Sequence, residues 1–227
     1  MRKRNGSAGR AAMASGKARW ARTAAAALAA AAIAALAGCG STAPANGDEG
    51  AIRVTTTIGQ ITDLVANVGG ERVAVTGIMP SGVDPHLYKA TQGDIGKFED
   101  ADIIFYNGLH LEGKMTEVFE EMAEQKPTIA VGESIDPAEL LEVAETDGTK
   151  TYDPHIWFDV KLWMKAAETV RDELTKLDPD NAATYEANAS EYLAELEALD
   201  AYARENIATI PEGQRVLVTA HDAFGYF

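Results

Sequence analysis

The feature that most constrains the fold is a regular alternation of β-branched runs and helical patterns between residues 52 and 131. Residues 52–57 are β-branched apart from Arg53, and residues 58–68 then place apolar side chains at helical spacing. Strands that alternate with helices in this way form a parallel sheet covered by helices, so we predict an α/β fold. The other expected strands are 73–78, 102–106 and 128–131, and the other expected helices are 91–101 and 114–125.

Two longer helices are expected after this alternation. Asp159 is a suitable cap for a helix that ends near Leu177. Asp178 and Pro179, a capping residue and a proline at the first helical position, predict the start of another, which ends near residue 209. At 1.5 Å per residue this helix would span roughly 45 Å, enough to join two lobes. An independent coiled coil is the alternative, because apolar residues recur at heptad spacing: Tyr185, Ala189, Tyr192, Leu196, Leu199 and Ala203.

The tripeptide Asp-Pro-His occurs twice, at residues 84–86 and 153–155, and holds two of the four histidines. Proline stiffens the backbone just ahead of each imidazole, and the aspartate can contact the ring or the loop backbone. A preorganised neutral imidazole with a carboxylate nearby suits a transition metal. Because His221 is also next to an acid, we expect His86, His155 and His221 to bind one divalent transition metal ion.

The three histidines follow expected strands. His86 comes after the strand that ends near Met79, His155 lies in the long loop after residue 131, and His221 follows a further expected strand at residues 215–220. Loops at the carboxyl ends of parallel strands line the ligand crevice of α/β folds. A strand that no helix follows is a poor end for such a lobe, so the chain is expected to be a fragment.

The amino-terminal residues have the pattern of a bacterial lipoprotein signal. Basic residues without any acid precede an alanine-rich run at 23–35, which is short for a membrane span and ends in Leu-Ala-Gly-Cys. We expect residues 1–38 to be a signal peptide, Cys39 to be lipidated and residues 39–51 to be a flexible tether. A plain signal peptide with an incidental cysteine is the alternative. Cys39 is the only cysteine, so the chain has no intrachain disulfide.

The net charge becomes more negative when residues 1–38 are excluded. Thirteen basic and 35 acidic residues remain, which is a net charge of −22. Such a charge argues against nucleic acid as a partner and against electrostatic adhesion to anionic lipid. It fits an exported protein that attracts cations, and it also fits a demand for solubility alone.

Together, these stretches resemble the solute-binding lipoproteins of zinc and manganese ABC importers, also called metal-binding adhesin lipoproteins. The resemblance lies in residues 75–90 (VTGIMPSGVDPHLYKA), 104–115 (IFYNGLHLEGKM), 152–159 (YDPHIWFD) and 218–227 (VTAHDAFGYF). It implies two Rossmann-like lobes with parallel sheets, joined by one long helix, with the metal held between them.

The resemblance also implies an organisation into domains. Residues 52–177 would be the N-terminal metal-binding lobe, 178–209 the inter-lobe helix, and 210–227 the start of a C-terminal lobe that is mostly missing from this chain. His86, His155 and His221 match the family's ligands, and a fourth ligand, an aspartate, would follow Phe227. His110 matches a family segment but no ligand, and we expect a structural role for it.

In function, the resemblance implies a monomer, lipid-anchored to the bacterial membrane and facing outside, that delivers zinc or manganese to an ABC permease. Three imidazoles favour zinc. The histidine-rich loop of zinc-dedicated members is absent from residues 141–152, so both metals stay open. One alternative is a zinc-dependent hydrolase, although no carboxylate in the motifs stands out as a general base. A surface adhesin is the other.

Overall fold

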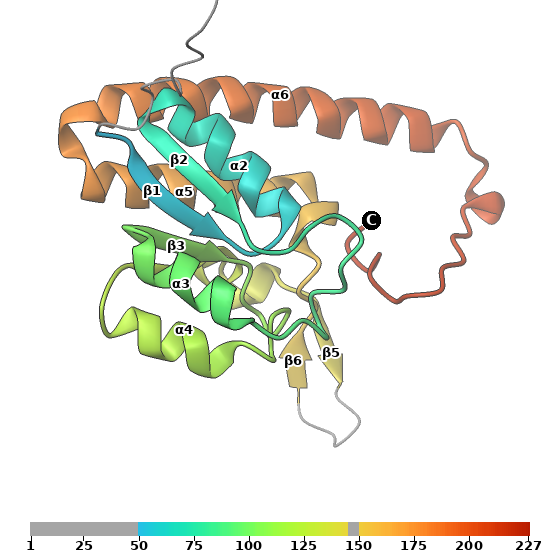
Figure 1. The fold of residues 1–227 in the computed structure, drawn as a ribbon. Helices are drawn as coiled ribbons and strands as arrows, with labels where there is room; N and C mark the ends of the chain where they lie inside the picture. Colours follow the sequence, from blue (N-terminus) through green and yellow to red (C-terminus); the bar gives the residue numbers. More distant parts are fainter. Residues whose placement is uncertain (1–49, 145–149) are drawn as a thin grey trace, which may run out of the picture. The chain divides into compact units, whose positions relative to one another are not determined.

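A four-stranded sheet forms the centre of the fold in the computed structural model, which describes residues 50–144 and 150–227 (Figure 1). Its order is β2-β1-β3-β4, and every neighbouring pair is parallel, which confirms the predicted α/β class. The predictions for residues 1–39, including lipidation of Cys39, lie outside the described residues. The strands are β1 (Ile52–Thr56), β2 (Val73–Gly77), β3 (Ile103–Tyr106) and β4 (Thr128–Ala130).

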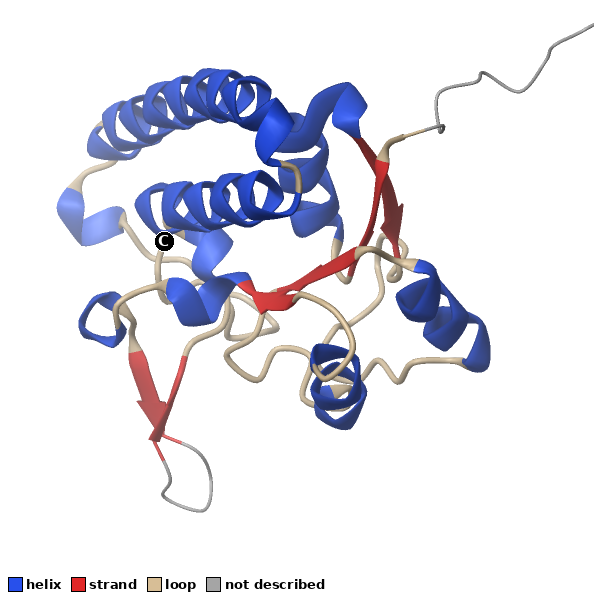
Figure 2. Ribbon diagram, turned by 90° about the vertical axis from the view of Figure 1, so that its left-hand side faces the viewer, coloured by secondary structure: helices blue, strands red, loops and turns tan. Residues whose placement is uncertain are grey.

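Helices cover both faces of the sheet (Figures 1 and 2). Helix α2 packs with α5 and α6 on one side, whereas α3 contacts α4 on the other. The apolar residues of α2 that the helical spacing predicted are all buried, and they form part of the core: Ile61, Leu64, Val65 and Val68. The helix bounds are α2 Gly59–Gly69, α3 Gln92–Asp100, α4 Thr116–Ala123, α5 Val160–Leu177 and α6 Ala182–Ala208.

The starts of α5 and α6 differ in how well local sequence predicts them. Asp159 caps α5 as expected, and its side chain accepts hydrogen bonds from the backbone N–H groups of Lys161 and Leu162. Asp178 and Pro179 begin the helical segment that leads into α6, as predicted, but the Asp178 side chain makes no capping hydrogen bond. A 3-10 turn at Pro179–Asn181 precedes the helix. The Asp178 carboxylate instead accepts a hydrogen bond of 2.8 Å from the hydroxyl of Tyr185.

Helix α6 has 27 residues and is therefore about 40 Å long. Its first half packs on the lobe: Tyr185 and Ala189 are fully buried, and Asn188 Nδ2 donates a hydrogen bond of 3.0 Å to the carbonyl of Val68. Its second half is open, with Leu199 50 % and Tyr202 66 % exposed. The heptad seam is thus buried over only part of its length.

Two expectations about the rest of the chain are corrected. Residues 215–220 are not a strand, because a strand needs a neighbour for its backbone hydrogen bonds and no described strand pairs with them. The expected long loop before His155 contains an antiparallel pair, β5 (Glu142–Ala144) and β6 (Lys150–Tyr152). No helix within residues 50–144 and 150–227 has both the length and the apolar character that crossing a membrane requires.

Candidate metal centre

Three imidazoles converge at the carboxyl-terminal side of the strands. The Nε2 atom of His155 lies 3.2 Å from Nε2 of His86 and 3.2 Å from Nε2 of His221. Nitrogen ligands at about 2.05 Å from a tetrahedral ion are roughly 3.3 Å apart, so this spacing suits one ion. Within the part of the chain that the structure describes, these three form the one group of histidine, cysteine or acidic side chains with such proximity.

The loop that carries His86 follows β2 and is tied to the lobe through Tyr88. Asp84 Oδ1 accepts a hydrogen bond of 2.9 Å from the backbone N–H of His86, which fixes the turn of the tripeptide. Two residues after His86, the hydroxyl of Tyr88 donates to Asp94 Oδ2 at 2.7 Å. Asp94 belongs to the capping box that Thr91 forms at the start of α3. The His86 loop is therefore fastened to the first turn of that helix.

These hydrogen bonds stabilise the ionised carboxylate of Asp94. Burial alone would raise its pKa, but hydrogen bonds from Tyr88, Thr91 and Lys97 outweigh burial and lower the pKa to about 2. The same contact raises the pKa of Tyr88 to about 12. At His86, burial and then the neighbouring His155 lower the imidazole pKa below 6.5, which favours the neutral ring that a metal needs.

The second copy of the tripeptide holds its histidine more firmly. Asp153 Oδ1 accepts from the backbone N–H of His155 at 3.0 Å, as in the first copy, and it also lies 2.7 Å from Nδ1 of the same ring. A carboxylate at Nδ1 keeps the proton there and leaves Nε2 free to bind an ion. Both residues are buried, and the ring of Trp157 packs edge-on against the imidazole of His155.

The buried side-chain amide of Asn107 connects the His155 loop to the end of β3. Asn107 follows β3 directly, and its Nδ2 donates to the carbonyl of Pro154 at 2.9 Å. The Glu112 carboxylate accepts from the backbone N–H groups of Asn107 and Gly108 and from the hydroxyl of Thr57. Burial raises the pKa of Glu112, and these hydrogen bonds oppose the rise. Sequence reasoning missed Asn107 and Glu112, although the Asn-Gly pair marks a turn.

The chain between Asn107 and Glu112 turns through left-handed backbone. Gly108, Leu109 and His110 have φ angles of 77°, 52° and 63°. The turn brings the backbone N–H groups of residues 107 and 108 onto the Glu112 carboxylate. His110 is exposed on this turn and is not one of the three converging imidazoles.

His221 reaches the group from the end of the chain. It is exposed, and it follows an exposed stretch that includes the residues expected to form a strand. Its ring centroid lies 5.2 Å from that of His155 and 5.4 Å from that of His86. The three histidines thus come from three separate segments of the chain.

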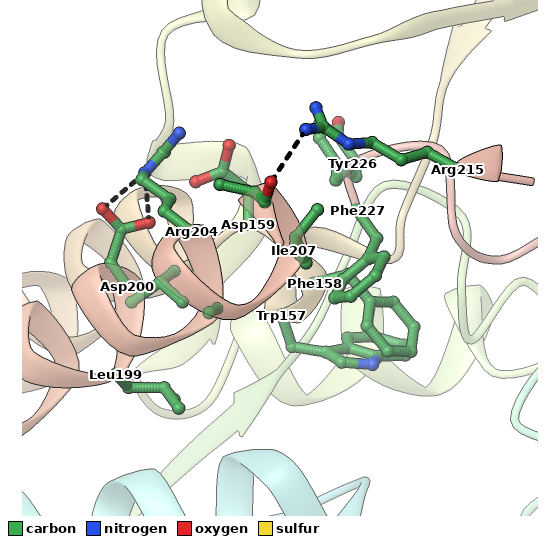
Figure 3. A pocket seen from close by; sticks show the side chains of 13 residues that line it. Trp157, Phe158, Asp159, Leu199, Asp200, Arg204, Ile207, Arg215, Tyr226 and Phe227 are labelled. Carbon is green, nitrogen blue, oxygen red and sulfur yellow. Dashed lines mark hydrogen bonds and ion pairs between the residues drawn. The ribbon is translucent and has the colours of Figure 1, made fainter. Parts of the chain in front are cut away.

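A cavity of about 610 Å³ lies among the start of α5, the second half of α6 and the last residues of the chain (Figure 3). Its aromatic lining includes Trp157, whose ring also contacts His155. The charged groups are paired: Arg204 Nε is 2.9 Å from Asp200 Oδ2, and Arg215 donates to backbone carbonyls. None of the three converging histidines lines the cavity.

Comparisons with known proteins define the class. Residues 54–227 match the family model described as "Zinc-uptake complex component A periplasmic". The manganese-binding lipoprotein MntA of Bacillus subtilis (strain 168) is 46 % identical over 190 residues, which cover 84 % of this chain and 61 % of MntA. The zinc-binding protein TroA of Treponema pallidum (strain Nichols) is 45 % identical over 179 residues, covering 79 % of this chain and 57 % of TroA.

The solved structure of periplasmic zinc-binding protein TroA from Treponema pallidum has the same fold. It superimposes with a TM-score of 0.75 at 46 % identity, covering 78 % of this chain and 63 % of that one. The fold is therefore that of TroA, and members of this family are solute-binding proteins of ABC transporters and not enzymes, which counts against the zinc-hydrolase alternative. Within that class, the chain belongs to the family of the periplasmic zinc-uptake component A. It spans about 60 % of the length of these curated relatives.

Proposed function

We propose that the protein is the substrate-binding lipoprotein of an ABC importer and captures one divalent transition metal ion through His86, His155 and His221. The observation that carries the proposal is the convergence of three Nε2 atoms at spacings of 3.2 Å around His155. The ion is cargo in this function, and the protein's task is to hold it until transfer. Firm but reversible binding requires ligands that are already oriented, as His155 is by Asp153.

The cargo is zinc or manganese. Three imidazoles favour zinc on the general affinity order, whereas an additional carboxylate would suit manganese. Relatives that are 46 % and 45 % identical are named for manganese and for zinc, respectively, and support both choices. We propose a fourth ligand, an aspartate, in a second lobe beyond Phe227, as the family resemblance implies; the match covers only 61 % and 57 % of these relatives. Residues 52–177 would then be the first lobe, and residues 178–209 the helix that joins the two lobes.

Delivery to a membrane permease and anchoring by lipid complete the proposal. Relatives in the same family are named lipoproteins, and the Leu-Ala-Gly-Cys sequence ends a signal-like run. We propose that the Cys39 sulfur carries diacylglycerol, which holds the protein on the outer face of the cytoplasmic membrane. Cys39→Ala should move the protein from the membrane fraction to the medium or periplasm. Unchanged fractionation of the variant would reject lipidation.

Metal binding is tested on the full-length protein, expressed from its complete reading frame. Titration with Zn²⁺ and Mn²⁺ in competition with a chelator should give one ion per chain. His86→Ala, His155→Ala and His221→Ala should each weaken binding more than about 100-fold, because losing a ligand costs more than losing a group that supports one. His110→Ala is the matched control and should stay close to wild type. A loss in the control as large as that of His86→Ala would show that the ligand set is wrong.

A further inference from the structure

The segment that carries His221 is attached to the lobe by very few residues. In the described structure every residue from 208 to 222 is exposed, and the ring of His221 lies beside the imidazoles of His86 and His155. The packed residues come directly after it: Ala223 is 7 % exposed, and Tyr226 is half-buried. The contacts of residues 223–227 therefore help to place His221 against this lobe.

The hydroxyl of Tyr226 makes two hydrogen bonds to the base of the β5–β6 pair. It accepts from the backbone N–H of Leu141 at 3.1 Å and donates to the carbonyl of Asp153 at 3.0 Å. The backbone N–H of Asp153 in turn donates to the carbonyl of Leu141 at 2.9 Å. A phenol has one proton to donate and can accept as well, and both capacities are used here. Tyr226 thus binds the first residue of the loop that carries His155.

The neighbours of Tyr226 contact the same loop. The ring centroid of Phe224 lies 4.4 Å from the ring centroid of Phe158. A Cβ atom added to Gly225 would lie 2.6 Å from Asp153 Oδ2, so the two are in close contact. The other oxygen of Asp153 holds Nδ1 of His155. One aspartate therefore orients His155 and also lies against the segment that carries His221.

We propose that Tyr226 is a positioning residue that fastens the His221 segment to the His155 loop, so that both imidazoles are spaced for one ion before the ion binds. This inference rests on the proposed metal-binding function. Without these two hydrogen bonds, the His221 segment would be held less firmly against the His155 loop, and the ion would have to bring the two together on binding. Ordering a segment at the moment of binding lowers affinity, and ligands held in place beforehand avoid that loss.

Tyr226→Phe tests the inference, because it removes the two hydrogen bonds and keeps the ring. In full-length protein titrated with Zn²⁺ against a chelator, we expect roughly tenfold weaker binding, the size of an ordinary hydrogen-bond loss. In a His221→Ala background the same change should have no further effect, because the fastening acts only through His221. Tyr202→Phe, at an exposed tyrosine of α6, is the matched control and should bind like wild type.

The outcomes separate this inference from the proposed function. If His86→Ala destroys binding but Tyr226→Phe binds as tightly as wild type, the fastening is refuted and the metal site stands. If Tyr226→Phe costs the same factor with and without His221, its role is general stability, and the inference is also refuted. If wild-type protein binds no Zn²⁺, both fail. Thermal melting of ion-free Tyr226→Phe is measured alongside to show that the variant is folded.

Discussion

The two Asp-Pro-His loops have the same tripeptide and the same turn, but they hold their histidines differently. In both, the aspartate accepts a hydrogen bond from the backbone N–H of the histidine. Only Asp153 also contacts the imidazole itself, and it is buried, whereas Asp84 is exposed. The difference comes from the surroundings: Asn107 holds the second loop through the carbonyl of Pro154, while the first is attached through Tyr88. A repeated motif thus fixes the turn, and distant residues decide how rigidly the ligand is aimed.

Removing the two aspartates separately tests whether the two loops hold their histidines differently. Asp153→Ala should weaken Zn²⁺ binding by about 10–100-fold, the usual cost of losing a carboxylate that orients a ligating histidine. Asp84→Ala should weaken it only a few-fold, because it loses a backbone contact and no ring contact. Chelator competition on both full-length variants gives the ratio. Equal losses would mean that the turn, and not the ring contact, is what both aspartates supply.

The amide of Asn107 offers a second, smaller test. Asn107→Ala removes the hydrogen bond to the Pro154 carbonyl and should weaken Zn²⁺ binding roughly tenfold through His155. Asn188→Ala is a matched control, because Asn188 Nδ2 also donates to a backbone carbonyl but lies at the far contact between α6 and α2. The control should lower thermal stability and leave affinity unchanged. An equal loss of affinity in the control would remove the specific role of Asn107.

Asp94, which holds the first loop through Tyr88, should matter more for the stability of the fold than for metal affinity. The pKa of Asp94 is about 2 in the folded protein against 3.8 ordinarily, so its ionised form stabilises the fold. That contribution is complete above about pH 4 and is lost as the pH falls toward 2. Asp94→Asn should lower the free energy of unfolding by about 1–2 kcal/mol near neutral pH, flatten its dependence between pH 4 and 2, and change affinity less than threefold.

Urea unfolding at several pH values measures the effect of Asp94→Asn. Asp100→Asn, at the exposed carboxyl-terminal end of the same helix, is the control and should keep the wild-type profile. If both variants titrate as wild type does, Asp94 is not the group that stabilises the fold in this range.

Local sequence patterns predicted where most strands and helices lie, together with a helix cap whose contacts are local. The β-branched runs and helical spacing gave the parallel sheet and its helices, and Asp159 caps α5 through residues two and three positions on. Asp178 has the same local signal, but its carboxylate instead binds Tyr185 and lies 3.5 Å from Arg72. Residues 215–220 have a strand's composition, yet composition supplies no neighbouring strand.

The candidate site also has residues that the sequence predicted and residues that it did not. Repetition of the tripeptide and the family resemblance pointed to the three histidines that the structure brings together. Asn107 and Tyr226 were not predicted, because they act on backbone atoms 47 and 73 residues away. Such pairs depend on how the lobe folds, and an asparagine or tyrosine gives no sign of its distant partner.

The left-handed turn at residues 108–110 has a further consequence, for engineering. Left-handed backbone costs an ordinary L-residue about 1–2 kcal/mol, and both Leu109 and His110 adopt it. Glycine carries no such cost, although it loses about 0.5–1 kcal/mol through the greater freedom of the unfolded chain. His110 is exposed and is not one of the converging imidazoles, so His110→Gly should raise the melting temperature slightly and leave the metal affinity unchanged. The protein thus holds conformational strain that can be released at one position away from the three converging histidines.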